Sequence, residues 1–600
     1  MKLYGGGLIV HTLKSYGVKH LFALPGHQIL SVFDSCQEEG LDLVSPRHEA
    51  SAVFMAQALS LAGLEPGVAL LAGGPELTNA LTGIAQAYYS NTPLVVISGS
   101  NTPAKRDKGF PQDMDQFQVV RPFTKWARGC HDVKRIPEYL AMAFRQAQRG
   151  RPGPVYLEVP YDVMETRVAG GDVNVPEKPA RLRAGVDPEA IKALAVLLKQ
   201  AERPVAIAGS GALWSDAQLE LQEFVQKTGV PLVLSSAAMA MPFPSEAVIG
   251  LGGLGIARPS IKAITSADLL LLLGTRLNFA LGFGQPPFIS ARQKIAQVDI
   301  EAEEIDANRR VDLGIVADLK TVLRSFNSLD FSLPSLENWR DELRKSVGKY
   351  DIELHRIASS PRQPMHPLRL ILDLESSRSD DSYLVLDGAN SILWALMAVR
   401  TRPQGGIILS TQGELQAIGA GVPQALAIQR AYPGRKVILH TGDGSFGYGA
   451  MEMETAVRYR IPLVVVVHND GGWGMTRDMQ VEFFGKRGES AHQFGVVHYE
   501  PLVESLGGHG EFVDRAEQFK PALERALGSG RPACVNVLVD PKPKSPGLKM
   551  FMLMEVMLGK KTYYDRIPSW LRRLQIVGLD RLANQAMLRY LDHNLHNEME

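Results

Sequence analysis

Short runs of consecutive apolar residues alternate with longer amphipathic segments along most of the chain. In the first part, the runs are VALLA (68–72), PLVVISG (93–99) and PVYLEVP (154–160), and SAVFMAQALSLAG (51–63) has the length and pattern of a helix. Continuous apolar runs indicate strands that are covered on both faces. Such strands in alternation with helices predict a parallel sheet flanked by helices.

The same alternation occurs in two further parts of the chain. The second part contains PVAIAGSGA (204–212), PLVLSS (231–236), DLLLLLGTRLN (268–278) and KIAQVDI (294–300), and the third contains SYLVLDG (382–388), GIILST (406–411), KVILHTGDG (436–444), LVVVVHND (463–470) and CVNVLVD (534–540). Segments rich in proline and charge predict linkers at 169–188 and 325–367. The predicted fold class is therefore α/β, with three doubly wound parallel-sheet domains at 1–168, 188–328 and 361–545.

Residues 546–600 have a different pattern. KMFMLMEVML (549–558) is rich in methionine, and residues 567–593 have helical periodicity with basic residues interspersed. They predict a helical C-terminal extension that packs on a domain or on a second subunit. A helix that binds a membrane surface or another partner is the alternative.

Charge and cysteine content exclude several classes of protein. Lys and Arg together number 64, as do Asp and Glu, so the chain offers no net attraction to nucleic acid or to an anionic membrane. The three cysteines form no cluster, which argues against a disulfide framework and a structural zinc site. No segment reaches the roughly 18–20 apolar residues of a transmembrane helix. We expect a cytoplasmic protein whose partners are small molecules and copies of itself, with no nucleic acid.

Glycines and acidic residues follow two predicted strands of the third part. One strand runs into GDG (442–444), and the next runs into NDGG (469–472). The carboxyl ends of neighbouring parallel strands form the crevice in which α/β folds bind ligands. Asp443 and Asp470 each offer a carboxylate to a hard cation, while Ser445 begins a helix whose N-terminus favours anions. The pattern predicts a Mg²⁺-diphosphate ligand.

This constellation resembles the signature of thiamine-diphosphate enzymes of the acetolactate synthase, pyruvate decarboxylase and benzaldehyde lyase kind. The resemblance extends to RHEASAVFMAQALSLAG (47–63), GGPELTNALTGIAQAYYSNTPLVVISG (73–99) and RPFTKWA (121–127). It implies that the three domains are pyrimidine-binding, middle and diphosphate-binding domains in that order. It also implies thiamine diphosphate and Mg²⁺ as cofactors, and it allows a nucleotide (ADP, CoA or FAD) at the middle domain.

The resemblance assigns catalytic roles to four residues. Glu49 matches the glutamate that hydrogen-bonds the aminopyrimidine ring and promotes the imino tautomer. His27 and Gln28 occupy a loop where related enzymes relay protons to substrate, and Gln116 matches a glutamine held near the cofactor. For His27, an ordinary loop histidine is the alternative.

Cofactor contacts are implied at more positions. Ile418 matches the apolar residue that props the cofactor in a V shape, and Asn390 and Ser391 match polar residues at the diphosphate, although Ser391 also suits a helix cap. The complete implied cofactor-binding set is Glu49, Gly74, Asn79, Asn390, Ser391, Gln416, Ile418, Gly442, Asp443, Gly444, Ser445, Asp470, Gly472, Trp473, Gly474 and Met475. The implied metal ligands are Asp443, Asp470 and Gly472. The resemblance further implies a homodimer or homotetramer, with each site formed between two subunits.

Two residues depart from the family pattern, and the substrate class stays open. Asp470 stands where asparagine is usual, and Glu76 where glycine is usual. The middle domain and the GDG helix resemble 2-hydroxyacyl-CoA lyases and oxalyl-CoA decarboxylases, whereas FTKWA (123–127) and GGWGMT (471–476) resemble benzaldehyde lyase. The resemblance implies a carbon–carbon lyase or carboligase that works through a C2 carbanion and an enamine on a 2-hydroxyacyl-CoA, acyloin or aldehyde. An acetolactate synthase-like enzyme for 2-oxo acids is the main alternative, and a non-catalytic homologue is a third.

Overall fold

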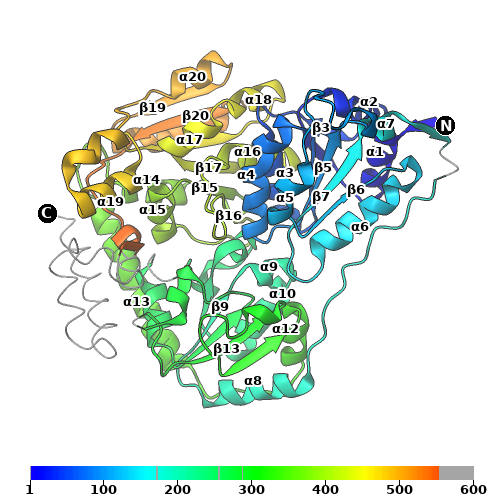
Figure 1. The fold of residues 1–600 in the computed structure, drawn as a ribbon. Helices are drawn as coiled ribbons and strands as arrows, with labels where there is room; N and C mark the ends of the chain where they lie inside the picture. The colour runs from blue at the N-terminus through cyan, green and yellow to red at the C-terminus, as the bar shows by residue number, and fades with distance from the viewer. Residues whose placement is uncertain (1, 170–172, 254–256, 287, 550, 553–600) are drawn as a thin grey trace.

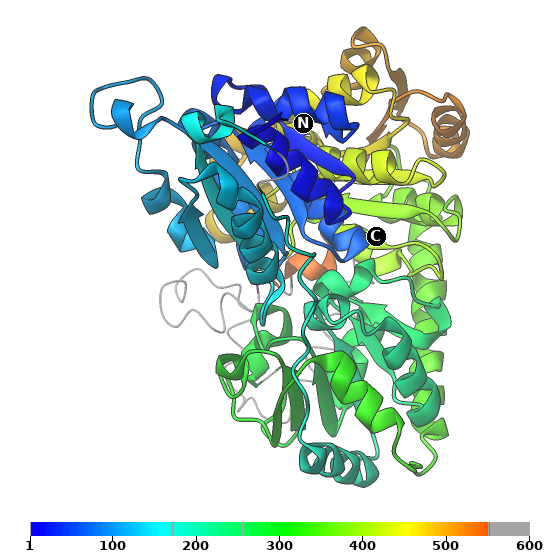
Figure 2. The same cartoon turned by 90° about the vertical axis from the view of Figure 1, so that its right-hand side faces the viewer.

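The computed structural model describes residues 2–169, 173–253, 257–286, 288–549 and 551–552. Three helix-flanked sheets lie side by side, and the sheet that is second in sequence lies below the other two in Figure 1. Figure 2 shows the chain crossing from the first sheet to the second. Of the predicted C-terminal helical extension, residues 550 and 553–600 lie outside the described residues. No helix in the described ranges has the length and apolarity required to cross a membrane.

The first sheet has the order β3-β2-β4-β5-β7-β6, and its strand pairs are all parallel. Its strands are β2 (His20–Ala23), β3 (Asp42–Val44), β4 (Gly67–Leu71), β5 (Leu94–Ser100), β6 (Trp126–Gly129) and β7 (Pro154–Pro160). Its helices are α1 (Gly5–Ser15), α2 (Leu30–Glu39), α3 (Glu49–Gly63), α4 (Pro75–Tyr89), α5 (Gln116–Val120), α6 (Ile136–Gln148) and α7 (Tyr161–Glu165). Helices α3 and α4 cover one face, and α1, α2 and α6 cover the other. A short antiparallel pair, β1 (Lys2–Tyr4) and β8 (Arg167–Ala169), lies apart from this sheet.

The middle sheet, in the order β11-β10-β9-β12-β13-β14, is also parallel. Its strands are β9 (Pro204–Ala208), β10 (Leu232–Leu234), β11 (Val248–Leu251), β12 (Leu269–Leu273), β13 (Lys294–Asp299) and β14 (Leu313–Val316). Its helices are α8 (Pro188–Gln200), α9 (Ser210–Trp214), α10 (Gln218–Thr228), α11 (Arg258–Ser266) and α12 (Leu319–Asn327). The strand order reverses between β9 and β12, which is where doubly wound sheets bind ligands.

The third sheet has the order β16-β15-β17-β18-β20-β19, again parallel. Its strands are β15 (Tyr383–Asp387), β16 (Ile407–Leu409), β17 (Val437–Gly442), β18 (Val464–Asn469), β19 (His509–Val513) and β20 (Ala533–Leu538). Its helices are α14 (Pro367–Ser376), α15 (Asn390–Ala398), α16 (Gly421–Ala431), α17 (Asp443–Gly449), α18 (Glu452–Arg458), α19 (Gly474–Phe484), α20 (Glu500–Ser505) and α21 (Ala516–Gly528). The predicted fold class is confirmed for the three parallel sheets.

The predicted linker at 325–367 needs correction, because most of it is helix. Helix α13 spans Glu337–Ala358, and its long charged surface hides a buried stripe that includes Trp339, Leu343, Tyr350 and Leu354. These positions recur at helical spacing and pack against the neighbouring domains. Polar residues between them gave the segment the composition of a linker.

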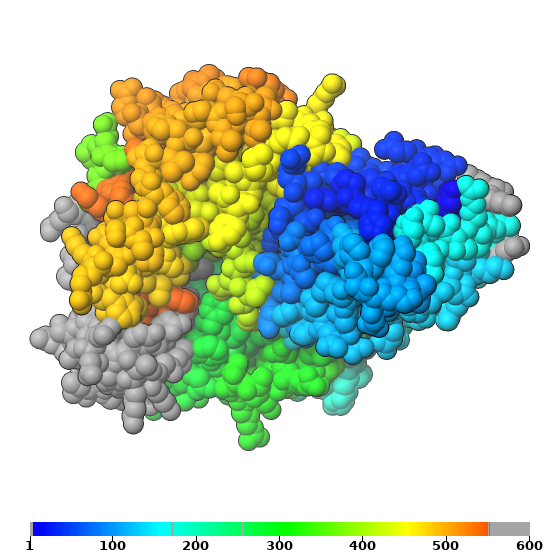
Figure 3. All heavy atoms as spheres, turned by 45° about the horizontal axis from the view of Figure 1, so that its top comes forward, coloured from blue at the N-terminus to red at the C-terminus, as the bar shows by residue number. Residues whose placement is uncertain are grey.

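The first and third parts of the chain pack directly on each other through α3 and α16. Gln424 donates to the Gln57 carbonyl oxygen at 3.3 Å, and Arg430 forms an ion pair with Asp42 at 2.8 Å. Both helices are buried over most of their length, since α3 covers its own sheet with one side and meets α16 with the other. Figure 3 shows the two parts in continuous contact on one face of the molecule.

Candidate functional site

The carboxyl ends of β17 and β18 border a pocket in the third part. Gly442 lies beside His468 in the sheet register, so the two following loops start at the same height. The lining residues are Ala389, Asn390, Ser391, Ile418, Gly442, Asp443, Gly444, Ser445, His468, Asp470, Gly472, Trp473, Gly474, Met475 and Thr476. Twelve of these were implied by the sequence resemblance, whereas Ala389, His468 and Thr476 were not. The structure thus brings together residues that are separated by up to 87 positions in sequence, from Ala389 to Thr476.

Asp443 carries an acidic group deep in this pocket. Its side chain accepts hydrogen bonds from the backbone N–H groups of Gly444 at 2.8 Å and Gly472 at 2.9 Å. Burial, and then the nearby charge of Asp470, raise the pKa of Asp443 to about 7. Two carboxylates that repel each other at adjacent strand ends are a donor set that suits a hard divalent cation.

The pocket also has a polar cradle next to these carboxylates. Gly388, whose φ is 110°, lies close to several polar groups. If it carried a side chain, the Cβ would lie 3.3 Å from both the Gly442 nitrogen and the Ser445 hydroxyl, and closer still to the Ser391 hydroxyl. A Cβ on Gly444 would lie 2.5 Å from the Trp473 ring. Glycines therefore leave room where hydroxyl and N–H groups converge, which is the requirement for a phosphate group. The residues fit Mg²⁺-diphosphate.

Asp387 holds the neighbouring loop, and sequence reasoning missed it. Its carboxylate, 1% exposed, accepts N–H donors from Gly388, Gly419 and Gly421, while burial raises its pKa to about 6. The bonds from Gly419 and Gly421 fix the backbone that follows Ile418. The signal was present in the sequence as an acidic residue at a strand end, in the segment DGANSILW (387–394).

A second, largely apolar pocket continues from the first one toward the middle sheet. Ala389, Ile418 and Met475 line both pockets. The second pocket is further lined by Met239, Phe279, Ile392, Leu393, Leu396, Leu409, Phe551, Gln416 and smaller or polar residues. Its described lining contains no charged side chain. A ligand that extends from the phosphate cradle past Ile418 therefore enters an uncharged space.

The implied catalytic glutamate lies in the first part of the chain, at the start of α3. Glu49 is 8% exposed, and its carboxylate accepts a hydrogen bond from the Asn79 amide at 2.9 Å. Asn79 lies on α4, so two helices of the same sheet face position this carboxylate. The pairing agrees with the implied placement of both residues near one cofactor ring.

Gln28 and Gln116 both hold the turn between β4 and α4. The Gln28 carbonyl oxygen accepts the Gly73 N–H at 2.6 Å, and the Gln116 carbonyl oxygen accepts the Gly74 N–H at 3.2 Å. Gln116 also donates to Glu158 at 3.0 Å, and both glutamines are at most 2% exposed. The structure gives them a scaffolding contact, and their catalytic role stays a prediction.

His27 and Glu76 lie at the edge of the same region. His27 is exposed, with its ring centroid 5.9 Å from that of Tyr161. The half-buried Glu76 carboxylate accepts the Gln112 amide at 3.2 Å. Glu76 precedes Asn79 by three positions on α4, so the two side chains are neighbours on one helix face.

Glu49 and the phosphate pocket share no polar contact among the described residues of one chain. Among the described residues, the Glu49 carboxylate makes no hydrogen bond or ion pair with any residue that lines the pocket. Its neighbour Arg47 instead donates its backbone N–H to Glu452 on α18 at 3.1 Å. Among the described residues of one chain, the two sets of implied cofactor residues therefore share no direct polar contact.

The middle sheet has a charged pocket at its reversal point. The lining includes Ser210, Gly211, Gly274 and Thr275 from the ends of β9 and β12, together with Arg151, Arg181, Arg276, Asp299, Glu304 and Asp318. Burial raises the pKa of Asp299 to about 6.

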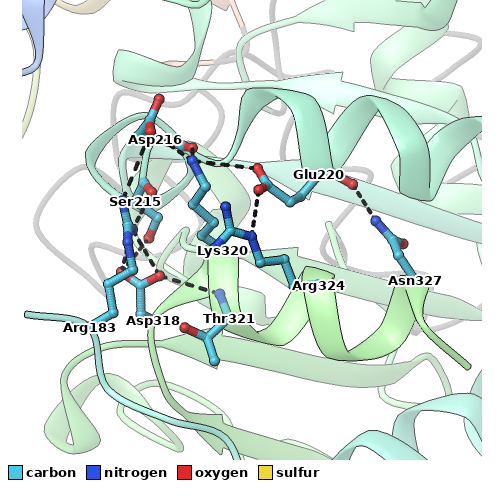
Figure 4. Close-up of polar contacts among 9 residues, drawn as sticks. All are labelled: Arg183, Ser215, Asp216, Glu220, Asp318, Lys320, Thr321, Arg324 and Asn327. Atoms are coloured by element: carbon cyan, nitrogen blue, oxygen red, sulfur yellow. Dashed lines mark hydrogen bonds and ion pairs between the residues drawn. The ribbon is translucent and has the colours of Figure 1, made fainter.

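An ion-pair network supports one wall of this pocket (Figure 4). In it, Arg183 donates to Asp318 at 3.1 Å, Lys320 binds Asp216 at 2.7 Å, and Arg324 binds Glu220 at 2.8 Å. Arg183 lies in the segment that connects the first two sheets, so the network fastens this connection to α12. The Asp318 carboxylate is therefore paired with Arg183 at the pocket wall.

Comparisons with known proteins agree with this arrangement. Three family models match in order: thiamine pyrophosphate enzyme, N-terminal TPP binding domain (residues 4–119), central domain (191–326) and C-terminal TPP binding domain (387–537). An acetolactate synthase large subunit of Mycobacterium tuberculosis is 31% identical over 91% of this chain and 97% of its own length. A 2-hydroxyacyl-CoA lyase of Arabidopsis thaliana is 30% identical (90% and 96%), and an oxalyl-CoA decarboxylase of Escherichia coli is 29% identical (90% and 95%).

Proposed function

The chain belongs to the thiamine pyrophosphate enzyme family, and on that premise we propose that it is a Mg²⁺-dependent carbon–carbon lyase or carboligase for neutral 2-hydroxy carbonyl compounds. Thiamine diphosphate, when bound, supplies the carbon nucleophile and the electron sink. In this proposal, Asp443, Asp470 and the Gly472 carbonyl hold Mg²⁺. Ser391, Ser445 and the surrounding N–H groups bind the diphosphate.

The protein's own residues have three tasks in the reaction. Ile418, fixed by the N–H bonds around Asp387, props the cofactor and forms the entrance to the apolar pocket. Glu49, oriented by Asn79, exchanges a proton with the pyrimidine ring. The apolar walls exclude water from the reacting carbonyl, which limits side reactions.

The uncharged lining of the apolar pocket is the observation that carries the substrate class. A 2-oxo acid brings a carboxylate that would be buried without a cationic partner there, and an unpaired buried charge is costly. An acyloin or a 2-hydroxyacyl thioester presents a neutral carbonyl and an apolar chain. The pocket therefore favours the lyase over the acetolactate synthase-like alternative, although a relative of each kind is about equally similar.

A substrate panel tests this proposal. The purified protein, loaded with thiamine diphosphate and Mg²⁺, is incubated with acyloins, 2-hydroxyacyl-CoAs and 2-oxo acids, and the products are identified by mass spectrometry. We expect aldehydes from the neutral substrates and little turnover of 2-oxo acids. Preferential formation of acetolactate from pyruvate would instead establish the alternative.

The charged pocket of the middle sheet supports a nucleotide as a further ligand. Gly211 and Gly274 let the two strand ends approach closely, the half-buried Asp299 suits ribose hydroxyls, and Arg151 and Arg276 offer charge to phosphates. This pocket shares Ser236, Asn278 and Gly413 with the apolar pocket. Flavin absorbance of the purified protein would reveal FAD. Equilibrium dialysis would reveal binding of ADP or CoA, which lack that absorbance.

A homodimer or homotetramer completes the proposed site. Glu49 makes no polar contact with the phosphate pocket among the described residues of one chain, so in this proposal the Glu49 of a second copy lies beside the pocket. Exposed aromatic side chains near the pocket, Tyr448 (70% exposed) and Phe494 (40% exposed), support an interface there. The three cysteines, buried and unpaired, are compatible with the cytoplasm that we propose as its compartment.

A further inference from the structure

Arg477 is buried next to the proposed metal ligands. It lies in the first turn of α19, and its side chain is 8% exposed beside that of Asp470, which is 9% exposed. The guanidinium donates at 3.2 Å to the Asp470 carboxylate and at 3.2 Å to the Asp470 backbone carbonyl. One residue thus holds both the side chain and the backbone of a proposed Mg²⁺ ligand.

Arg477 and Asp470 lie in a pocket with several other acidic groups. Asp443 and Asp470 are both acidic, and a bound diphosphate adds further negative charge in the same pocket. Asp478 also faces Arg477 at 3.7 Å. Burial raises the pKa of Asp478 to about 6, while the charges of Arg477 and Lys544 oppose that rise.

Among the described residues, Lys544 forms its ion pair with Glu482 at 3.7 Å, and the cation that contacts Asp470 is Arg477. Arg477 is closer to Asp470, at 3.2 Å, than to Asp478, at 3.7 Å. The ion pair of Asp470 and Arg477 therefore has the net charge of a neutral asparagine at position 470.

We propose that Arg477 is the built-in countercharge of Asp470, which lets an aspartate act as a near-neutral metal ligand and sets the affinity of the pocket for Mg²⁺ and diphosphate. This inference rests on the proposed Mg²⁺-diphosphate site. Arg477 is a positioning residue, because it acts through Asp470 without contact to the cofactor. The guanidinium contacts Oδ2 of Asp470, so Oδ1 is the oxygen that would bind the cation.

The two halves of the pair predict opposite effects on cofactor binding. Arg477→Met keeps the apolar stem but leaves an extra negative charge beside the diphosphate, so the Kd for thiamine diphosphate at saturating Mg²⁺ should rise at least about tenfold. Asp470→Asn leaves an extra positive charge, so that Kd should stay equal or fall. The double variant restores the balance and should bind within about threefold of the wild type.

Titration of thiamine diphosphate, followed by tryptophan fluorescence and by calorimetry, measures these constants without any need for turnover. Trp473 lies against Gly444 in the pocket and serves as the internal reporter. Arg525→Met removes an ion pair between Arg525 on α21 and Glu511 on β19; it is the matched control and should bind as the wild type does. Arg477→Lys keeps the charge and should bind more tightly than Arg477→Met, which gives a second comparison if the methionine variant fails to fold.

Three outcomes overturn the inference. They are equal weakening by Asp470→Asn and Arg477→Met, a double variant as weak as Arg477→Met, or unchanged binding in folded Arg477→Met. Failure of the wild type to bind thiamine diphosphate also overturns it, together with the cofactor site. A protein that binds the cofactor but converts none of the substrate panel contradicts the proposed reaction alone.

Discussion

Binding of Mg²⁺ to this site should release a proton, because Asp443 holds one near neutral pH. Burial and the charge of Asp470 raise the pKa of Asp443 to about 7, whereas an ordinary aspartate in an unfolded chain has a pKa near 3.9. A metal ligand must be deprotonated, so the cation and the proton compete for this carboxylate.

The expected magnitude follows from this pKa. For a group with a pKa of about 7, close to 0.9 proton is released per cation at pH 6, about half a proton at pH 7 and about 0.1 at pH 8. The apparent affinity for Mg²⁺ should fall by roughly tenfold for each pH unit well below 7. Calorimetric titration of the cofactor-free protein with Mg²⁺, in buffers of different ionisation enthalpy at one pH, counts the protons directly.

The same shift determines how stability depends on pH. The folded-state pKa is raised, so Asp443 contributes stability that is present below pH 4 and is lost as the pH rises through about 7. The Tm of metal-free protein should therefore fall between pH 5 and 8 relative to that of Asp443→Asn, and Mg²⁺ should reverse the fall. Mg²⁺ binding at pH 6 without proton release, or with the same release in Asp443→Asn, would refute this reasoning.

Four further predictions concern catalysis, the metal, assembly and the choice of substrate. Glu49→Gln should lower turnover at least about a hundredfold while cofactor binding largely survives, as steady-state kinetics and titration will show. EDTA dialysis or Asp443→Ala should release thiamine diphosphate, and retention of full affinity in dialysis would contradict the metal assignment. Mixed Glu49→Gln and Asp443→Ala subunits should regain part of the activity, since some mixed dimers contain one intact site; no recovery after confirmed subunit exchange would place each site within one chain. Glu76→Gln should raise kcat/KM for 2-oxo acids relative to acyloins by about tenfold, because it removes a negative charge near the substrate; an unchanged ratio excludes Glu76 from the choice of substrate.

The parts of the site that follow strand ends could be predicted from the sequence. GDG (442–444) and NDGG (469–472) come directly after uninterrupted apolar runs, so their placement at one sheet edge follows from the parallel order of the strands. The edge strands β6, β14 and β19 lacked that signal, because they are partly exposed and less apolar.

Partners across the chain could not be predicted in this way. Asp387 was visible as an acidic strand end, but two of its three N–H donors, Gly419 and Gly421, come from a loop that reaches it only in the folded sheet. Arg477 follows Asp470 by seven positions, and whether it points inward depends on how α19 packs. Likewise, the sequence places Gln28 and Gln116 near the cofactor loop, but only the structure shows their amides on Gly73 and Gly74.

The contact between α3 and α16 also has a consequence for biosynthesis. Gln57 and Gln424 are separated by 367 positions, and at about 5–20 residues per second a ribosome needs roughly 20–70 seconds to add the second after the first. During that time, α3 has its own sheet on one side and no cover on the other, although Val53, Phe54 and Met55 are buried in the finished protein. The nascent first part therefore presents an apolar helix to solvent for most of translation, which makes it a natural client of chaperones and exposes it to aggregation when synthesis stalls.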